Sequence, residues 1–400
     1  MRFTSLIIVL ILLTACGSSP SSVLPPVELT PIDNKINIAR LWKFKIGDGV
    51  RDFYLKLKPV FNNDTGYVID HKGYLISFDA KTGALIWDKQ LNTSVSAGLT
   101  YADGFLFFGN SKGEVIAFNT RTGKESWRAQ LSSEVLSAPV FSNGILVVKS
   151  IDGAVYGLDA VNGLQRWIYT SSVPQLTLRG NSSPVISNDI VIVATDSGKL
   201  MALSLSQGKL LWDATIAIAK GRNQLERIID IDVEPQIVAD VIYVASYQGR
   251  IAAVKISSGE LIWSRDFSTY SGLVVDAFRV YATDSMGQVW ALNRFNGSTL
   301  WRQDKLLRRQ LTAPATQDKY LVVGDYDGYL HWLTREDGKI IARKRMNSSD
   351  VIIPDEEIDK ETEMLFSKWN NILVKPVVMN DVLISLDRVG HLDAFRIEKN

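Results

Sequence analysis

A ten-residue pattern that recurs along most of the chain limits the possible folds more than any other feature of the sequence. In its clearest copies, residues 78–87 and 118–127, a glycine stands four positions before a tryptophan. The tryptophan position recurs at intervals of 40, 40, 45, 51, 38 and 41 residues, at Trp87, Trp127, Trp167, Trp212, Trp263, Trp301 and, in a degenerate copy, Ala342. A repeat of this length with several short strands is typical of one blade of a β-propeller.

Each repeat divides into four strand-like stretches. The first begins with proline or glycine, which suits a short strand at a sheet edge. The second is rich in β-branched residues, as in 145–148, the third alternates, as in 114–118, and the fourth carries the tryptophan. A polar turn with glycine separates the second and third stretches, at Gly73, Gly113, Gly153, Gly198, Gly249, Gly287, Gly328 and Gly390. These eight turns predict eight four-stranded blades.

The two ends of the repeat array are incomplete in complementary ways. The last repeat has a third stretch, residues 390–397, but no fourth, whereas residues 41–44 look like a fourth stretch without the preceding three. We therefore expect the N-terminal segment to supply the outer strand of the last blade, which closes the ring and removes its open edges. The predicted fold is all-β, a single eight-bladed propeller of four-stranded antiparallel blades over residues 39–400.

The first residues resemble an export signal for a lipoprotein. Arg2 precedes an apolar run over residues 6–13, which is too short to span a bilayer but suits a signal peptide. The run ends in Leu-Thr-Ala before Cys16, a sequence that resembles the bacterial lipobox and predicts lipidation of this single cysteine. A buried, unmodified cysteine is the alternative interpretation. We expect residues 1–15 to be the signal peptide and 16–38 a lipidated N-terminus with a flexible tether. No aspartate follows Cys16 directly, which favours the periplasmic side of the cell outer membrane over retention at the inner one.

The charge balance limits the partners of such a ring. The sequence has 44 basic and 43 acidic residues, and removal of residues 1–15 leaves 43 of each. Because there is no basic excess to neutralise phosphates, we expect no nucleic-acid partner. Attraction to a protein partner must then come from local groups of charges.

The glycine-to-tryptophan repeat resembles that of the pyrroloquinoline-quinone (PQQ) dehydrogenase family of eight-bladed propellers. With a lipobox in front and one propeller filling the rest, the sequence looks like the propeller lipoproteins of the outer-membrane β-barrel assembly (BAM) complex. This resemblance implies a non-catalytic scaffold that binds the periplasmic domains of the barrel subunit BamA and assists the folding and insertion of β-barrel proteins. It also implies contact with other BAM lipoproteins through the complex, and with unfolded outer-membrane protein clients. A quinoprotein dehydrogenase or an envelope-sensing propeller is the alternative.

Several features disfavour the dehydrogenase. In that family the quinone commonly stacks against a disulfide between neighbouring cysteines, and a calcium ion polarises it. One cysteine cannot form such a disulfide, and no clustered metal-ligand motif is present. The three histidines, His71, His331 and His391, fall in separate repeats and are interpreted as surface or strand positions. We therefore expect no catalytic residue, metal or cofactor.

Long connections between blades are the best candidates for a binding surface, because binding residues favour loops on a rigid scaffold. Three are long, at about 171–183, 217–234 and 345–375, and all should lie on one face of the ring. The first holds alternating leucines beside an arginine, and the second holds paired carboxylates. Taken alone, these residues fit an interface or a local packing role equally well. The resemblance implies that they bind BamA, and the implied residues are Leu176, Leu178, Arg179, Asp230 and Asp232.

The third connection is strongly acidic. Residues 350–363 carry seven acidic side chains against one lysine, Lys360. An exposed helix and a docking site for a basic partner are both compatible with this composition.

Overall fold

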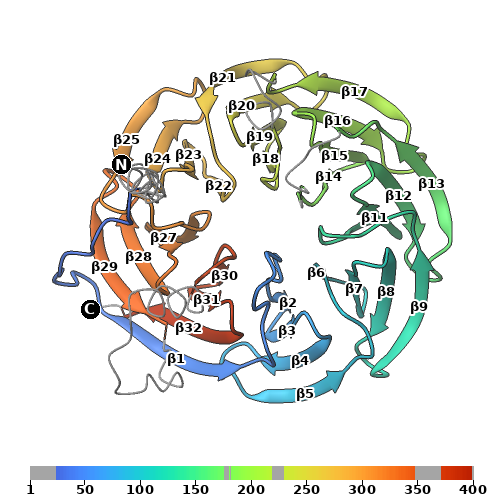
Figure 1. The fold of residues 1–400 in the computed structure, drawn as a ribbon, viewed down its shortest axis with the longest axis horizontal. Coiled ribbons are helices and arrows are strands. Elements are labelled where there is room, and N and C mark those ends of the chain that lie inside the picture. Colours follow the sequence, from blue (N-terminus) through green and yellow to red (C-terminus); the bar gives the residue numbers. More distant parts are fainter. Residues whose placement is uncertain (1–23, 175–179, 181, 219–228, 347–370, 399–400) are drawn as a thin grey trace, which may run out of the picture.

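The computed structural model describes residues 24–174, 180, 182–218, 229–346 and 371–398, and in them the chain forms a ring of β-sheets with no helix. Figure 1 shows eight four-stranded sheets arranged around a central axis. The prediction of an all-β, eight-bladed propeller is confirmed. Within these residues there is no helix long and apolar enough to cross a membrane.

In each of the first four blades, the strands run in chain order from the axis to the rim. Blade one holds β2 (Val60–Asn62), β3 (Thr65–Ile69), β4 (Tyr74–Asp79) and β5 (Leu85–Gln90). Blade two holds β6 (Ala97–Ala102), β7 (Phe105–Gly109), β8 (Glu114–Asn119) and β9 (Lys124–Gln130). Blade three holds β10 (Val140–Ser142), β11 (Ile145–Lys149), β12 (Ala154–Asp159) and β13 (Gln165–Thr170). Blade four holds β14 (Val185–Ser187), β15 (Ile190–Ala194), β16 (Lys199–Ser204) and β17 (Leu210–Thr215).

Blades five to seven repeat this order. Blade five holds β18 (Gln236–Val238), β19 (Val241–Ala245), β20 (Gly249–Lys255) and β21 (Leu261–Phe267). Blade six holds β22 (Gly272–Val275), β23 (Arg279–Thr283), β24 (Val289–Asn293) and β25 (Thr299–Gln303). Blade seven holds β26 (Ala315–Gln317), β27 (Tyr320–Gly324), β28 (Tyr329–Thr334) and β29 (Ile340–Arg345).

Blade eight joins the two ends of the chain, as the sequence predicts. It holds β30 (Val377–Met379), β31 (Val382–Leu386) and β32 (His391–Ile397), and its outer strand is β1 (Ile38–Lys45). β1 pairs antiparallel with β32 from Ile38 opposite Ile397 to Lys45 opposite His391. Every blade therefore has four strands, and the ring has no unfinished sheet.

The repeated tryptophans join neighbouring blades. The Trp167 Nε1 donates a hydrogen bond of 2.8 Å to the Leu205 carbonyl of the next blade. Its ring covers the hairpin glycine of that blade so closely that a Cβ added to Gly208 would lie 2.3 Å from it. Six tryptophans make both contacts with the following blade: Trp42, Trp127, Trp167, Trp212, Trp263 and Trp301. The glycine and the tryptophan that define the repeat in the sequence are therefore the residues that contact each other between neighbouring blades.

The degenerate position Ala342 has a structural reason. Its partner would be a hairpin glycine in blade eight, but that blade has no such hairpin because its outer strand comes from the N-terminus. A different contact joins these two blades. Trp332, fully buried in β28, donates 2.8 Å to the Gln317 side-chain oxygen, and the Gln317 amide donates 3.1 Å to the Phe395 carbonyl.

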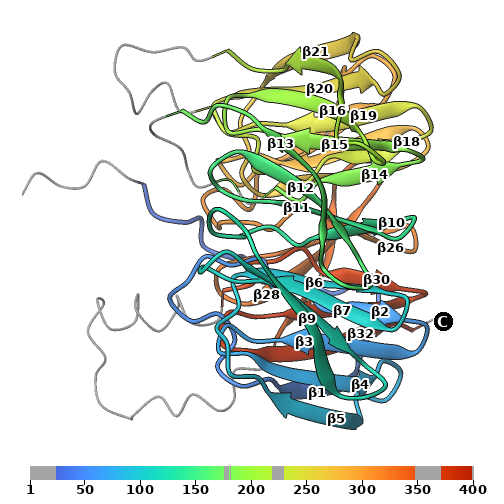
Figure 2. The same cartoon turned by 90° about the vertical axis from the view of Figure 1, so that its right-hand side faces the viewer.

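The ring has two distinct faces. The connections between blades lie on the same face as the turns between second and third strands, to which they are hydrogen-bonded, as from Leu91 N to Gly73 O and from Val95 N to His71 O. We call this the loop face; it is on the left in Figure 2. The three connections predicted to be long all leave this face. The remaining hairpins lie on the opposite face.

Candidate partner-binding face

The structure describes only part of the predicted binding site. Leu176, Leu178 and Arg179 lie outside the described residues, as does Cys16. Asp230 and Asp232 are described, in the segment that leads into the inner strand of blade five. The site can therefore be built from these two aspartates and their surroundings.

Asp230 is fully buried, so its carboxylate does not face the solvent. Its carbonyl accepts a 2.8 Å hydrogen bond from the Tyr247 amide, which ties this segment to a turn of its own blade. A partner could not touch the Asp230 side chain without a rearrangement.

Gly180 packs against three carboxylates. A Cβ added to Gly180 would lie 2.7 Å from the Asp196 Oδ1, 2.8 Å from the Asp230 Oδ1 and 3.0 Å from the Asp232 Oδ1. A side chain at this position would displace them, so glycine allows residue 180 to approach. The structure thereby brings together described residues of the two long connections on either side of blade four, as expected of consecutive blades.

Asp196 and a lysine of the neighbouring blade were missed by the sequence analysis. The Lys149 Nζ lies 3.3 Å from the Asp196 Oδ1 and donates 3.0 Å to the Ala194 carbonyl, and both charged side chains are buried. This ion pair links blade three to the turn beneath Gly180. A signal was present, because Lys149 ends an otherwise apolar strand that the repeat places inside a sheet.

Two lysines of blade one reach across the axis to the Asp232 segment. The Lys56 Nζ donates 2.9 Å to the Asp232 carbonyl, and the Lys58 Nζ forms a 3.0 Å ion pair with Glu234. These residues lie 176 positions apart in the sequence. The connection from β1 to β2 that carries the lysines is itself long, which the sequence analysis also missed. The segment around Asp232 is thus fixed from the axis as well as from its own blade.

Burial and neighbouring charges shift the ionisation of this group. Burial lowers the pKa of Lys56. Burial opposes the charged form of Glu234, but Lys58 and the other nearby lysines outweigh it and lower the pKa of this carboxyl. Burial also lowers the pKa of Lys375, from blade eight, to about 8. The group is a compact set of opposite charges at the centre of the ring.

A cavity of about 390 Å³ lies beside these charges. Its lining comes from the inner strands and connections of several blades, and includes Tyr54, Lys56, Lys375, Asp232, Glu234, Tyr270 and Asn371. The cavity combines neutral hydroxyl groups with paired charges.

The three histidines lie apart from one another, as predicted, and each has its own partner. The His331 Nε2 lies 2.9 Å from Asp325, the His391 Nδ1 lies 2.7 Å from Asp387, and the His71 Nδ1 lies 2.7 Å from the Gly49 carbonyl. His331 and His391 are strand residues and are buried rather than at the surface. Their places fit structural roles in separate blades.

The described residues do not fit a quinoprotein centre. Among them, no group of three or more His, Cys, Asp or Glu side chains could hold a metal ion. The sequence contains one cysteine, so no pair of neighbouring cysteines can stack against a quinone.

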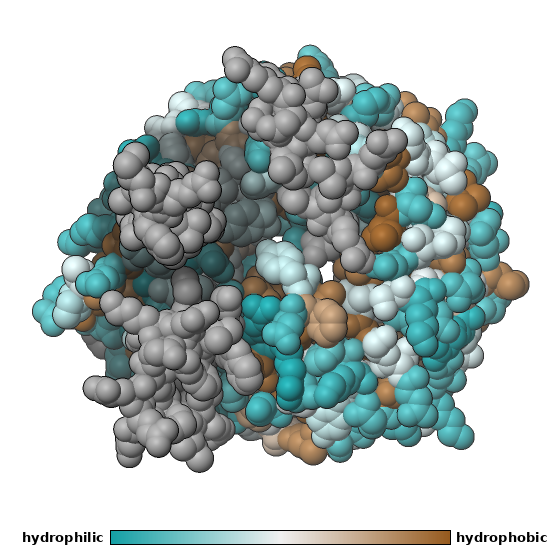
Figure 3. Space-filling model, in the orientation of Figure 1, coloured by the Kyte–Doolittle hydropathy of each residue, from teal (hydrophilic) through white to brown (hydrophobic). Residues whose placement is uncertain are grey.

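The visible part of the loop face is mainly polar. Figure 3, which views this face, shows hydrophilic residues over much of its surface with hydrophobic residues scattered between them. Individual apolar side chains are nevertheless exposed on it, among them Phe53, Ile218 and Met286. Such a face suits an interface with a few apolar anchors and charged neighbours.

Comparison with known proteins identifies the family. A family model described as "Outer membrane protein assembly factor BamB" matches residues 71–303. The "Outer membrane protein assembly factor BamB" of Pseudomonas aeruginosa is 42% identical over 350 residues, which cover 88% of this chain and 92% of that protein.

Solved structures agree on the fold. The crystal structure of BamB from Moraxella catarrhalis is similar with a TM-score of 0.77 and 24% identity, covering 90% of this chain and all of that one. A quinohemoprotein alcohol dehydrogenase from Comamonas testosteroni is also similar, with a TM-score of 0.67 but 12% identity, covering 91% of this chain and 77% of that one. At such low identity, this likeness shows the propeller fold alone. On the evidence of the family model and the close relative, the chain belongs to the BamB family of outer membrane protein assembly factors.

Proposed function

We propose that this chain is a non-catalytic scaffold subunit of the machinery that assembles outer membrane proteins. Membership of the BamB family carries the proposal, since a relative named as an assembly factor is 42% identical over most of the chain. A closed ring that presents loops from a rigid frame suits a scaffold. Its partners are the periplasmic domains of the BamA-type barrel subunit, the other BAM lipoproteins through the complex, and unfolded outer-membrane protein clients.

The loop face beside blade four is the proposed contact with BamA. Leu176, Leu178 and Arg179 supply apolar anchors and a cation, and Asp232 supplies a half-buried carboxylate at the edge of the channel. The buried Asp230 acts differently from the others, because it positions the segment instead of touching the partner. The ties from Lys56 and Tyr247 support this division, since they fix the backbone on both sides of Asp232.

A charge reversal at Asp232 tests this contact. The Asp232→Lys variant should lose at least ten-fold in affinity for the periplasmic domains of BamA, about 1.4 kcal/mol, because like charges across an interface repel. Asp240→Lys is the matched control, because Asp240 is exposed in the turn between β18 and β19, on the opposite face of the same blade. Both proteins are compared with the parent by co-purification and by thermal midpoint. Equal binding by the two variants, with both folded, would refute the placement.

The proposal includes a lipid anchor at Cys16, on the periplasmic side of the outer membrane. The pattern before this residue supports it, as does the absence of any other cysteine from the sequence. Several acyl chains on one residue anchor a protein stably, whereas one chain binds only marginally. Cys16→Ser should release the protein into the soluble fraction, and a variant that stays with the membrane would contradict the anchor.

A further inference from the structure

The residues that precede β1 are docked on the propeller. Residues 24–37 begin beside the label N in Figure 1, cross the loop face at blades six and seven, and continue at the rim along the outer strand β29. The Val27 amide donates 3.1 Å to the Leu307 carbonyl, and the Lys35 amide donates 2.8 Å to the Ile341 carbonyl. Leu29 packs between them against the apolar core shared by blades six and seven. We call residues 25–35 the N-terminal arm.

Three arginines of the propeller hold the main chain of this arm. Each guanidinium donates to an arm carbonyl: Arg308 Nε to Pro25 O at 2.6 Å, Arg309 Nη1 to Val27 O at 3.0 Å, and Arg343 Nη1 to Thr30 O at 3.1 Å. Asn34 adds a reciprocal pair with the Arg343 main chain, at 2.9 and 3.2 Å. These guanidinium groups bind main-chain carbonyls of the arm, so this part of the loop face holds the backbone of a segment that lies along it.

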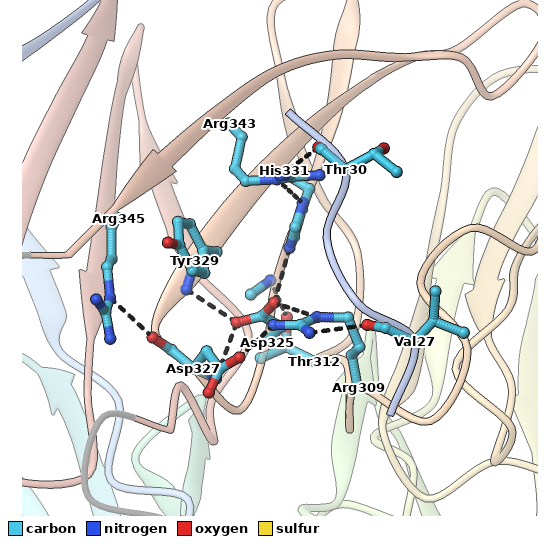
Figure 4. A network of polar contacts seen from close by, with 11 residues as sticks. Val27, Thr30, Arg309, Thr312, Asp325, Asp327, Tyr329, His331, Arg343 and Arg345 are labelled. Atoms are coloured by element: carbon cyan, nitrogen blue, oxygen red, sulfur yellow. Dashed lines mark hydrogen bonds and ion pairs between the residues drawn. The ribbon is translucent and has the colours of Figure 1, made fainter. Parts of the chain in front are cut away.

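The contact with Arg309 is part of a buried network (Figure 4). Arg309 is 3% exposed, and its Nε donates 2.8 Å to the fully buried Asp325 while its Nη2 pairs with Asp327 at 2.5 Å. The remaining Nη1 donates to the Val27 carbonyl. A buried guanidinium with an unused donor is costly, so the arm completes the hydrogen bonding of a charge that the ring cannot satisfy alone.

His331 continues this network to the middle of the arm. Its Nδ1 accepts a 3.3 Å hydrogen bond from the Arg343 Nε, so the ring hydrogen is on Nε2 and is donated to Asp325. Arg343 in turn holds the Thr30 carbonyl. The arm is therefore connected to the interior of blade seven through two arginines.

We infer that this docked arm turns the loop face of the propeller toward the lipid surface in which Cys16 is anchored. The inference rests on the lipid anchor of the proposed function. Pro25 lies nine positions after Cys16, and this stretch can span at most about 32 Å. If the arm were free, the 22 residues from Cys16 to Ile38 could span about 79 Å, enough for the ring to turn either face to the membrane. Docking thus restricts both distance and orientation.

This orientation specifies the kind of partner that fits the loop face. The described ends of the connections that lead into blades four and five leave the ring on the face that the first residues of the arm cross. A protein that binds them is held on the membrane side of the ring, as suits the periplasmic domain of a protein that is itself embedded in that membrane. The opposite face is directed away from the membrane.

The test measures the distance of each face from the bilayer. Since Cys16 is the only native cysteine and is acylated in the mature protein, single introduced cysteines can be labelled selectively. Met286→Cys on the loop face and Phe278→Cys on the opposite face form a matched pair. These side chains are 53% and 66% exposed, at the two ends of β23 in blade six, about 17 Å apart along the strand. The lipidated proteins carry a donor fluorophore, and vesicles of phosphatidylethanolamine and phosphatidylglycerol carry a lipid-bound acceptor.

Energy transfer from position 286 should exceed that from position 278 at least two-fold. The control replaces residues 25–35 by the same number of glycines and serines, which keeps the length of the chain, and transfer from the two positions should then become equal. Equal transfer with the native arm, or an unchanged difference with the replaced arm, would overturn the inference.

A second readout separates failure of the arm from failure of the anchor. In a soluble Cys16→Ser protein, hydrogen exchange of the Val27 and Lys35 amides should be slowed at least ten-fold relative to the unprotected rate, because both amides are hydrogen-bonded to the ring. Unprotected exchange would overturn the docking itself. Lack of vesicle association by the parent protein would instead overturn the anchor, while slowed exchange would still support the docked arm.

Discussion

Substituting one hairpin glycine at a time tests whether the tryptophan contacts hold the ring together. Gly208 and Gly123 occupy the same place in their repeats and have nearly the same backbone conformation, with φ of +66° and +65°. They differ in their surroundings. A Cβ on Gly208 would lie 2.3 Å from the Trp167 ring, whereas a Cβ on Gly123 would meet no atom within 4 Å.

The two alanine variants therefore separate backbone strain from collision with the indole ring of Trp167. Alanine in the left-handed conformation costs about 1–2 kcal/mol at either position. Gly208→Ala must also displace Trp167 in a packed interface, for which overpacking adds about 1–3 kcal/mol. The difference between the two variants is then about 1–3 kcal/mol, and the strain common to both cancels.

Calorimetric thermal midpoints measure this difference. For a propeller of this size, 1 kcal/mol corresponds to about 1–2 °C, so Gly208→Ala should unfold roughly 1–6 °C below Gly123→Ala. In a Trp167→Ala background the indole ring is absent. There, Gly208→Ala should lower the free energy of unfolding by no more than Gly123→Ala does in the parent. Equal midpoints for the two single variants would refute the claim that the glycine exists to admit the tryptophan.

Three further predictions concern buried ionisable groups. Burial lowers the pKa of His331 below 6.5, so the unfolded chain binds more protons than the folded one, and stability falls as the pH drops through 6.5. Asp387 has the opposite effect on His391, whose pKa it raises above 6.5. His391 therefore contributes stability below pH 6.5, and this stability is lost as the pH rises through the pKa of the folded state. Replacing either histidine by glutamine should remove its share of a pH profile of thermal midpoints from pH 5 to 8, and profiles that change in the same direction would contradict the assignment. Lys375, with a pKa of about 8, should react with an N-hydroxysuccinimide ester at pH 8 faster than exposed lysines, as measured by peptide mass mapping, and a slower reaction would count against its access through the cavity. In denaturant titration, Asp230→Lys should destabilise the fold by about 3–5 kcal/mol, because it buries a charge of the wrong sign, and Asp230→Asn should destabilise it by less. Equal stability of Asp230→Lys and the parent would show that this position is not buried in solution.

The fold could be predicted because its contacts repeat. Six of the repeated tryptophans make the same two contacts with the following blade, so the sequence shows the interface between blades as a regular spacing. Trp87 shows the limit of this reasoning. It fits the pattern, yet it lies beside Tyr67 and Phe118, and Gly123 of the next blade has no side chain against it. A local pattern does not reveal which copies make the full contact.

The surroundings of the site could not be predicted because they join residues that are distant in the sequence. Lys56 meets Asp232 only because the ring brings blades one and five to a common axis, and no periodicity links the two positions. The sequence also does not predict the burial of Asp230, since an Asp-x-Asp segment in a loop has the same pattern whether its first carboxylate is buried or exposed. The docking of the N-terminal arm depends on Arg309 and Arg343, which nothing in their own repeat distinguishes from surface arginines.

Site-specific photocrosslinking in living cells tests the central claim, that the loop face binds the barrel subunit. A photoreactive phenylalanine derivative is placed at Ile218 on the loop face, where the side chain is 68% exposed, and separately at Phe278 on the opposite face, where it is 66% exposed. We predict a crosslink to the BamA-type subunit from position 218 and none from position 278. A crosslink from position 278 alone, or from neither position while the two proteins co-purify, would contradict the account.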